Sequence, residues 1–156
     1  MITMTHYEQT RQSACGAYAL KMVLEYWGIK EDLDVLIDKI SVKIGVGASH
    51  EALIRVLRSY GLRVRTKSGA TIQDLKDSLD RSAPVVVNYI SPPSGLGHYS
   101  TVVGIEDGKV FLCDSSNGAD YSLEIEEFDR IWFNNDKTSR HWMAAPYRDR
   151  QKPSEG

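Results

Sequence analysis

Cysteine is scarce in this sequence, because only two of the 156 residues, Cys15 and Cys113, are cysteines. Two thiols are too few for a disulfide framework or for a zinc site built from four cysteines. His6 and His141 also lack the spacing with acidic residues that is typical of a metal site. We therefore expect no metal and no cofactor, and a free thiol becomes a candidate for chemistry.

An excess of charge of one sign is missing as well. The 19 Lys and Arg residues nearly balance the 21 Asp and Glu residues, which gives a formal net charge of -2. This balance provides no electrostatic attraction for nucleic acid or for an anionic membrane. Residues 1–8 lack the basic and apolar regions of a signal peptide, and no segment approaches the roughly 18 apolar residues of a membrane span. We expect a cytoplasmic protein without nucleic-acid partners or membrane insertion.

The composition is that of an ordinary globular protein. Hydrophobic residues make up 42% and charged residues 26% of the chain, and 156 residues suffice for one domain with a sizeable core. We expect a single domain over residues 1–147 and a polar, disordered tail over residues 148–156.

The first half of the chain has the pattern of helices. Residues 13–27 are apolar on nearly all sides until Gly28, which predicts a buried central helix. Residues 32–44 carry apolar side chains at helical spacing, Ser49 is the expected N-cap of a further helix, and Thr71 opens a fourth.

The second half has the pattern of strands. Residues 85–90, 99–105 and 109–113 are short runs rich in β-branched or aromatic side chains. We expect them to form an antiparallel sheet. Helices followed by strands favour an α+β fold in which the two parts pack on each other.

Cys15 lies in the first turn of the predicted central helix. The positive end of the helix dipole and the unpaired N–H groups there favour a nucleophilic thiolate. Gly16 removes bulk where a substrate carbonyl would approach, and the Cys15 backbone N–H is placed to donate to an oxyanion. A buried, inert cysteine explains Cys15 alone equally well.

His98 begins a strand directly after the irregular loop of residues 91–97, which places its imidazole at a sheet edge. Residues 106–108, Glu-Asp-Gly, predict a three-residue hairpin loop, so that Ile105 pairs with Lys109. Continuing this register makes His98 a diagonal neighbour of the strand-end carboxylate described next.

Asp114 is that carboxylate, and the same register pairs Thr101 with Cys113. Cys113 then points to the opposite face from Asp114, which predicts a core role for Cys113. Asp114 also has a simpler interpretation as the residue that initiates a turn at 115–118. The two roles of Asp114 are compatible.

Cys15, His98 and Asp114 together form the pattern of a nucleophile, a base and an orienting carboxylate. Gln9 and Gln12 precede the nucleophile, and a side-chain amide there is suited to donate a second hydrogen bond to the oxyanion. Physical reasoning on the sequence does not choose between them, and a solvated loop residue explains either glutamine.

Four segments match the motifs of a known family. Residues 9–16 have its glutamine, five intervening residues and Cys-Gly, and residues 97–104 resemble its Gly-His-Tyr-x-Val-Val segment. Residues 110–114 resemble its strand ending in Asp, and residues 128–132 its Phe-x-x-x-Trp element. The sequence thus resembles the C39 peptidases, papain-like domains that trim leader peptides from bacteriocin precursors.

This resemblance implies a papain-like α+β fold and a cysteine peptidase that hydrolyses peptide or isopeptide bonds in a peptide or protein substrate. It assigns the triad to Cys15, His98 and Asp114 and the oxyanion donor to Gln9 rather than Gln12.

The sequence departs from the family pattern at two positions, because Ser115 replaces a proline after the aspartate and Ala14 replaces an acidic residue. No transporter domain follows in the 156 residues, so we expect the chemistry of the family more firmly than leader trimming. An acyl transferase or deamidase would use the same acyl-enzyme. A non-catalytic peptide-binding module is the alternative from another class, and the intact triad argues against it.

Overall fold

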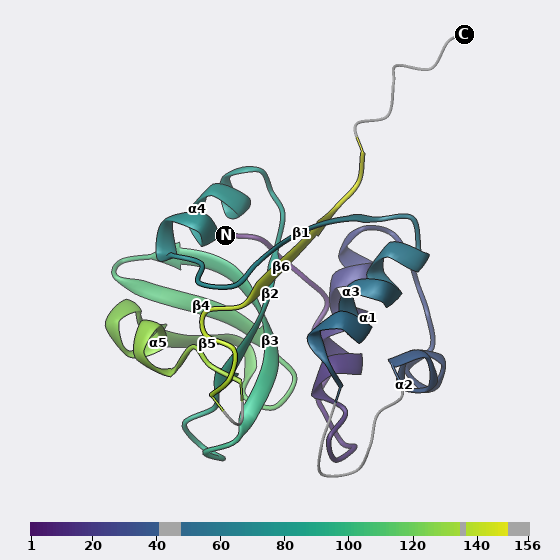
Figure 1. Ribbon diagram of the computed structural model, residues 1–156, viewed down its shortest axis with the longest axis horizontal. Coiled ribbons are helices and arrows are strands. Elements are labelled where there is room, and N and C mark those ends of the chain that lie inside the picture. Colours follow the sequence, from purple (N-terminus) through teal and green to yellow (C-terminus); the bar gives the residue numbers. More distant parts are fainter. Residues whose placement is uncertain (41–47, 135–136, 150–156) are drawn as a thin grey trace, which may run out of the picture.

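The computed structural model describes residues 1–40, 48–134 and 137–149 of the chain. A six-stranded sheet has the order β1-β6-β2-β3-β4-β5, and its neighbouring strands are antiparallel. Helices pack against it (Figure 1), so the α+β prediction is confirmed. The elements are α1 (Cys15–Tyr26), α2 (Leu33–Ile40), α3 (His50–Ser59), β1 (Arg63–Lys67), α4 (Ile72–Asp80), β2 (Val85–Ile90), β3 (Gly97–Glu106), β4 (Lys109–Asp114), β5 (Gly118–Glu124), α5 (Ile125–Ile131) and β6 (Met143–Tyr147).

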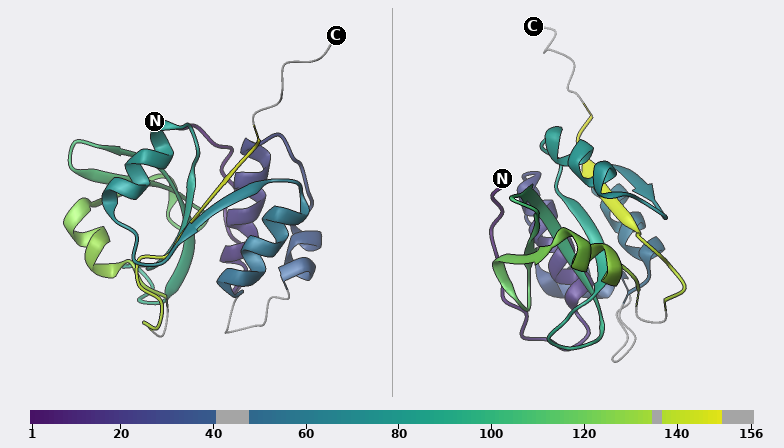
Figure 2. Two further views of the ribbon diagram at one scale, coloured as in Figure 1. Left: turned by 45° about the horizontal axis from the view of Figure 1, so that its top comes forward. Right: turned by 90° about the vertical axis from the view of Figure 1, so that its left-hand side faces the viewer.

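The two faces of the sheet bury different side chains. In β2, Val86 packs in a core with α1, α2 and α3, whereas Val85 and Val87 pack in a second core with α4 and α5. Successive side chains of a strand point to opposite faces, which explains this division. Figure 2 shows the two groups of helices on either side of the sheet. Both faces are therefore covered, and residues at the ends of the strands remain available for function.

The helix starts agree with the predicted caps. The Ser49 side chain accepts a hydrogen bond from the Ala52 backbone N–H at the start of α3, and Thr71 forms a capping box with Asp74 at the start of α4. Helix α2 ends at Ile40 within the described residues. The rest of that predicted helix, to about residue 44, lies outside the described residues.

The hairpin between β3 and β4 differs from the prediction. Its loop has two residues rather than three, Asp107 and Gly108, whose φ angles are 51° and 75°. Positive φ at both central residues is typical of a type I′ turn, which Asp-Gly favours and which suits the twist of a two-residue hairpin. Ile105 therefore pairs with Val110 and not with Lys109.

A β-bulge restores the predicted register further along this hairpin. The pairing shifts between Val102 and Gly104, and beyond it Thr101 pairs with Cys113 as predicted. A Cβ atom at Gly104 would lie only 2.4 Å from the Met1 side chain, so Met1 would have to shift to admit one. The bulge compensates the shorter loop, and it returns His98 to the face expected for contact with the end of β4.

Strands β1, β5 and β6 and helix α5 were not predicted as such. Strand β1 carries basic side chains at every other position and lies at the edge of the sheet. In the sequence it lies between α3 and α4, so helices and strands are not separated along the chain as expected. Strand β6 contains two alanines and Pro146, all poor strand residues. Met143 and Ala144 of β6 pair with β2, and Pro146 lies beyond this paired stretch.

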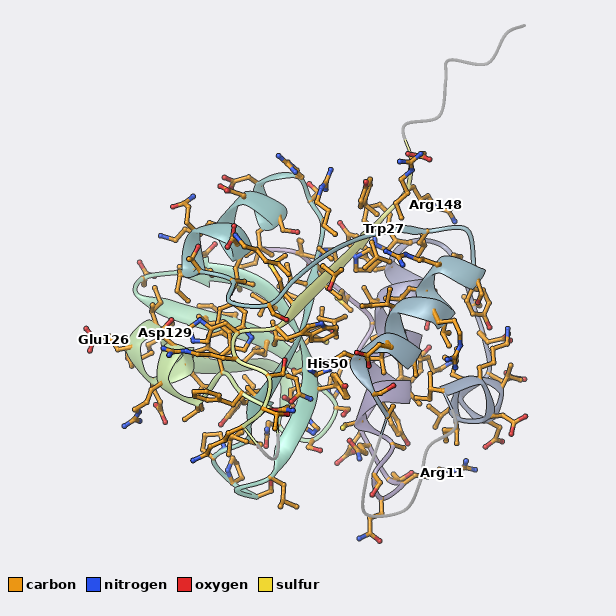
Figure 3. All side chains as sticks on the ribbon, viewed as in Figure 1. Arg11, Trp27, His50, Glu126, Asp129 and Arg148 are labelled. Atoms are coloured by element: carbon orange, nitrogen blue, oxygen red, sulfur yellow. The ribbon has the colours of Figure 1, made fainter. Side chains whose placement is uncertain are left out.

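The end of the described chain contacts the helical half. The Arg148 Nε atom donates to the Trp27 carbonyl at 2.8 Å, and Figure 3 shows these two residues side by side. Asp149 pairs with Arg63 at 2.6 Å. Residues 150–156 lie outside the described residues, and the division into a domain and a tail stays a prediction. Among the described residues, no helix has the length and apolar character needed to cross a membrane.

Candidate active site

The predicted triad residues come from three elements. Cys15 is the first residue of α1, His98 lies at the start of β3, and Asp114 is the last residue of β4. The His98 Nε2 atom lies 2.9 Å from the Asp114 Oδ1 atom, and His98 is also hydrogen-bonded to Cys15. Because Nε2 faces Asp114, Nδ1 is the ring nitrogen left for the thiol. The three side chains are thus in contact, with His98 in the middle.

The Cys15 thiol lies among backbone N–H groups. At the start of α1, Ala14 provides no side-chain cap, whereas Ser49 and Thr71 cap α3 and α4 with their side chains. The Tyr99 backbone N–H also points at the thiol, with 3.5 Å between nitrogen and sulfur. The N–H groups of a first helical turn and the helix dipole both favour negative charge, and Cys15 lies at this end of α1.

His98 is held as an imidazolium. Its side chain is buried, with 8% of its surface exposed. Burial lowers the pKa of His98, but the hydrogen bonds to Asp114 and Cys15 and the charges of both partners outweigh burial and raise the pKa to about 10. A proton is therefore present on His98 at neutral pH, as a general acid in this position requires.

The Asp114 carboxylate is fully buried and hydrogen-bonded on both oxygens. Oδ2 accepts from the Tyr89 hydroxyl at 2.7 Å, and Oδ1 accepts from the backbone N–H groups of Ser116 and Asn117, both at 3.0 Å, besides His98. Burial raises the pKa of Asp114, but the hydrogen bond and charge of His98 and the further hydrogen bonds lower it to about 2. Asp114 thus initiates a turn and contacts His98 at the same time, as the sequence allowed.

The two glutamines have different surroundings. The Gln9 backbone N–H donates to the Ser115 carbonyl at 2.7 Å, and the Gln9 Oε1 atom accepts from the Ser115 hydroxyl at 2.9 Å. Gln12 is exposed. Gln9 therefore lies next to the residue that follows Asp114, and the preference for Gln9 over Gln12 in catalysis stays a prediction.

Cys113 differs from Cys15 as predicted. Its side chain is 2% exposed and packs in a core cluster with Met22, whose sulfur lies 3.9 Å from the Cys113 sulfur. Burial raises the pKa of Cys113 to about 11. The Cys113 thiol is therefore protonated and shielded at neutral pH, and it is a core residue.

The family of the chain follows from its match to a known protein family. The model of the peptidase C39 family matches residues 3–135. The chain belongs to the peptidase C39 family. The resemblance seen in the sequence is therefore confirmed, and the protein is a cysteine peptidase. None of the curated proteins compared with the chain matches it.

Solved C39 structures share the fold. The peptidase domain of Streptococcus ComA, a bifunctional ABC transporter involved in a quorum-sensing pathway, has a TM-score of 0.75 and 16% identity over 96% of this chain and 100% of that chain. A putative C39-like peptidase from Bacillus anthracis has a TM-score of 0.75 and 18% identity over 95% and 96% of the two chains. A double-glycine-motif protease from an AMS/PCAT transporter, solved with the leader peptide, has a TM-score of 0.69 and 19% identity over 93% of each. The papain-like fold is thereby confirmed.

In this C39 domain, the sequence reasoning missed Tyr89. Its hydroxyl donates to Asp114 and accepts from the Asn117 side-chain amide at 3.3 Å. Tyr89 lies in an apolar strand, so its pattern indicates a core residue. Tyr89 pairs with His98 across β2 and β3, a register that the sequence analysis did not derive.

Gly16 has a different role from the one expected. A Cβ atom there would lie 3.3 Å from both the Leu53 and Tyr99 side chains and 3.5 Å from the Ala48 side chain. The glycine therefore makes room for packing against α3 and β3 rather than for a substrate carbonyl. The expectation about substrate approach was wrong, because the missing side chain would point into the core.

His50 lies where the helices meet the sheet (Figure 3). Its Nδ1 atom is 2.7 Å from the Tyr99 hydroxyl, and its ring stacks on Trp142 with 4.1 Å between ring centroids. Burial lowers the pKa of His50, so the ring is neutral. These contacts fit a structural residue. Within the described ranges, no group of three or more His, Cys, Asp and Glu side chains is arranged to hold a metal ion.

Proposed function

We propose that this cysteine peptidase hydrolyses peptide or isopeptide bonds with Cys15 as nucleophile, His98 as acid and base, and Asp114 as the orienting carboxylate. The observation that carries this proposal is the His98 imidazole, which is hydrogen-bonded to Asp114 through Nε2 and also to Cys15. The Asp114 contact holds the ring in one orientation, which is the task of the third member of such a triad.

The chemistry follows from these contacts. The Cys15 thiolate attacks the substrate carbonyl carbon, and the π electrons of that carbonyl move to its oxygen. Protonated His98 then gives its proton to the leaving amine as the C–N bond breaks, which leaves a thioester on Cys15. Water attacks the thioester, His98 takes a proton from it, and the acid product leaves with the thiolate restored.

The oxyanion that forms in each step needs hydrogen-bond donors. The Cys15 backbone N–H lies at the uncapped start of α1, and the Gln9 side-chain amide lies beside the end of β4. We assign both as donors, in agreement with the motif that Gln9 and Cys15 form in the sequence.

The proposed substrate is a peptide or protein, and the support is that a similar protease was solved with a leader peptide. The same thioester reacts with an amine in place of water, which would make the protein an acyl transferase. Product analysis with and without an added amine separates hydrolysis from transfer. A cytoplasmic location stays a prediction.

The experiment for this proposal compares the two cysteines. Cys15→Ala is expected to abolish cleavage of a peptide panel, while Cys113→Ala retains it, because only Cys15 contacts His98. Both variants are checked by circular dichroism for an intact fold. Comparable cleavage by Cys15→Ala and the parent protein would contradict the mechanism.

A further inference from the structure

The turn after β4 contacts Gln9 through side chains as well as backbone. The Ser115 hydroxyl donates to the Gln9 Oε1 atom at 2.9 Å, and the Ser116 hydroxyl donates to the same atom at 3.3 Å. Ser115 is buried, with 1% of its surface exposed, whereas Ser116 is exposed. The stronger and better shielded of the two contacts is therefore that of Ser115.

The surroundings of Gln9 determine which way its amide faces. Its Nε2 atom donates to the Arg11 carbonyl at 2.9 Å. A carbonyl oxygen only accepts hydrogen bonds, so the amide atom facing Arg11 must be the nitrogen, and the oxygen must face Ser115. The amide nitrogen carries two N–H groups, and Arg11 takes one of them. One N–H group remains for another acceptor.

The turn after β4 also positions the Asp114 carboxylate, which contacts His98. The backbone N–H groups of Ser116 and Asn117 donate to Asp114, while the Ser115 carbonyl accepts from the Gln9 backbone N–H. Asp114 and Gln9 are therefore positioned by one short segment. A hydroxyl at Ser115 adds control of the Gln9 side chain, which backbone contacts alone do not provide.

A half-exposed glutamine has several rotatable bonds, and a donor contributes to catalysis only when it is already aimed at the developing charge. We propose that Ser115 is a positioning residue that fixes the carboxamide of Gln9, so that its free N–H group is presented to the oxyanion. This inference rests on the proposed oxyanion role of Gln9. The family pattern has proline at this position. Proline has no hydroxyl, so a chain with proline there cannot form the hydrogen bond that Ser115 gives to Gln9.

Steady-state cleavage of one peptide substrate tests the proposal. Ser115→Ala is expected to lower kcat by about tenfold with little change in KM, which is part of the roughly 10²–10³-fold that one oxyanion donor contributes. Ser68→Ala, in the exposed bend after β1, is the control and should stay within about twofold of the parent. Ser115→Thr keeps the hydroxyl and should recover most of the activity.

Labelling of Cys15 by iodoacetamide forms no tetrahedral oxyanion, so Ser115→Ala should be labelled at the parental rate. Slower labelling would mean that the substitution disturbs the Cys15–His98 pair, and it would overturn the proposal. This readout and the melting temperature also separate a positioning role from a general loss of structure.

A double-mutant cycle decides whether Ser115 acts through Gln9. If it does, Ser115→Ala lowers kcat in the parent but has no further effect in a Gln9→Ala background. An equal loss in both backgrounds, or no loss in the parent, overturns the positioning role alone. If Gln9→Ala itself keeps the parental kcat, the oxyanion role of Gln9 fails, and the proposal for Ser115 fails with it.

Discussion

His98 and Asp114 come from adjacent strands and are buried, whereas Cys15 and Gln9 come from the start of α1 and the segment before it and are partly exposed. On the sheet side, the Asp114 carboxylate meets the side chains of His98 and Tyr89. On the helix side, the Cys15 sulfur meets the Tyr99 backbone N–H group as well as His98.

This difference indicates how each side is maintained. The sheet side depends on particular side chains that satisfy one another in a low-dielectric environment, so the loss of one leaves a buried polar group without a partner. The helix side depends on backbone N–H groups, those at the start of α1 and that of Tyr99 in β3, and these survive most side-chain substitutions. Substitutions should therefore have large effects on the sheet side and small effects on the helix side, apart from the reacting groups themselves.

The largest effect among the supporting residues is expected for Asp114→Asn. The amide removes the negative charge that stabilises protonated His98, and only one of its two polar atoms can accept hydrogen bonds where both Asp114 oxygens do so. We expect kcat/KM to fall by about 10²-fold or more. Asp120→Asn on the exposed part of β5 is the control and should leave kcat/KM unchanged. Equal activity of the two variants would remove Asp114 from the mechanism.

Tyr89→Phe should have the next largest effect. It deletes the hydroxyl that donates to the Asp114 Oδ2 atom and leaves this buried oxygen without that partner. Hydrogen bonds to charged groups contribute about 1.5–3 kcal/mol, so the free energy of unfolding in urea should fall by about that amount. Tyr121→Phe, in half-buried surroundings on β5, is the matched control. An unchanged urea midpoint for Tyr89→Phe would show that the network is not cooperative with folding.

Acid should weaken the sheet side through Asp114. Its pKa lies at about 2 in the folded protein, below the ordinary 3.8, because His98 and the other donors favour the carboxylate. A depressed folded-state pKa contributes stability above the unfolded-state value, and this stability is lost as pH falls through the folded-state value. We expect a loss of about 2 kcal/mol between about pH 4 and pH 2 that is absent in Asp114→Asn. Urea titrations at several pH values measure it, and parallel curves for the two proteins would contradict the assignment.

Gly16→Ala on the helix side should have the smallest effect. The added Cβ atom would lie 3.3 Å from the Leu53 and Tyr99 side chains, which is a tight contact that small shifts relieve. The better helix propensity of alanine offsets part of this cost, so we expect a stability change within about 1 kcal/mol and nearly parental kcat/KM. A severe loss of activity at unchanged melting temperature would favour the rejected view that Gly16 makes room for the substrate.

Local chemistry explains the parts of the fold that the sequence predicted. The uninterrupted apolar face of α1, the caps at Ser49 and Thr71, and the β-branched residues of β2 all act within a few residues of one another. Strand β6 could not be predicted in this way, because its alanines and Pro146 have poor strand propensity and are placed by partners distant in sequence.

The site shows the same limit. Motif and strand register predicted Cys15, His98 and Asp114, and the structure brings their side chains together. Their second contacts were not predicted, since the hydroxyl of Tyr89 reaches Asp114 across the sheet, and the surroundings that distinguish Gln9 from Gln12 come from a turn more than a hundred residues away. Long-range contacts of this kind leave no local pattern in a single sequence.

Cys15 and His98 form one reactive pair in this mechanism, and the pH dependence of thiol alkylation is the measurement that tests the pair. The rate of iodoacetamide labelling is followed by intact mass, with peptide mapping to separate Cys15 from the buried Cys113. The parent protein should be labelled at Cys15 well below neutral pH, to about pH 6, while Cys113 is spared. In His98→Ala the thiolate loses its positive partner, so the rate of Cys15 labelling at about pH 6 should fall by at least about tenfold. The rate should return to the parental value only at alkaline pH. If the two rate profiles overlay, Cys15 and His98 do not form a pair and the mechanism is wrong.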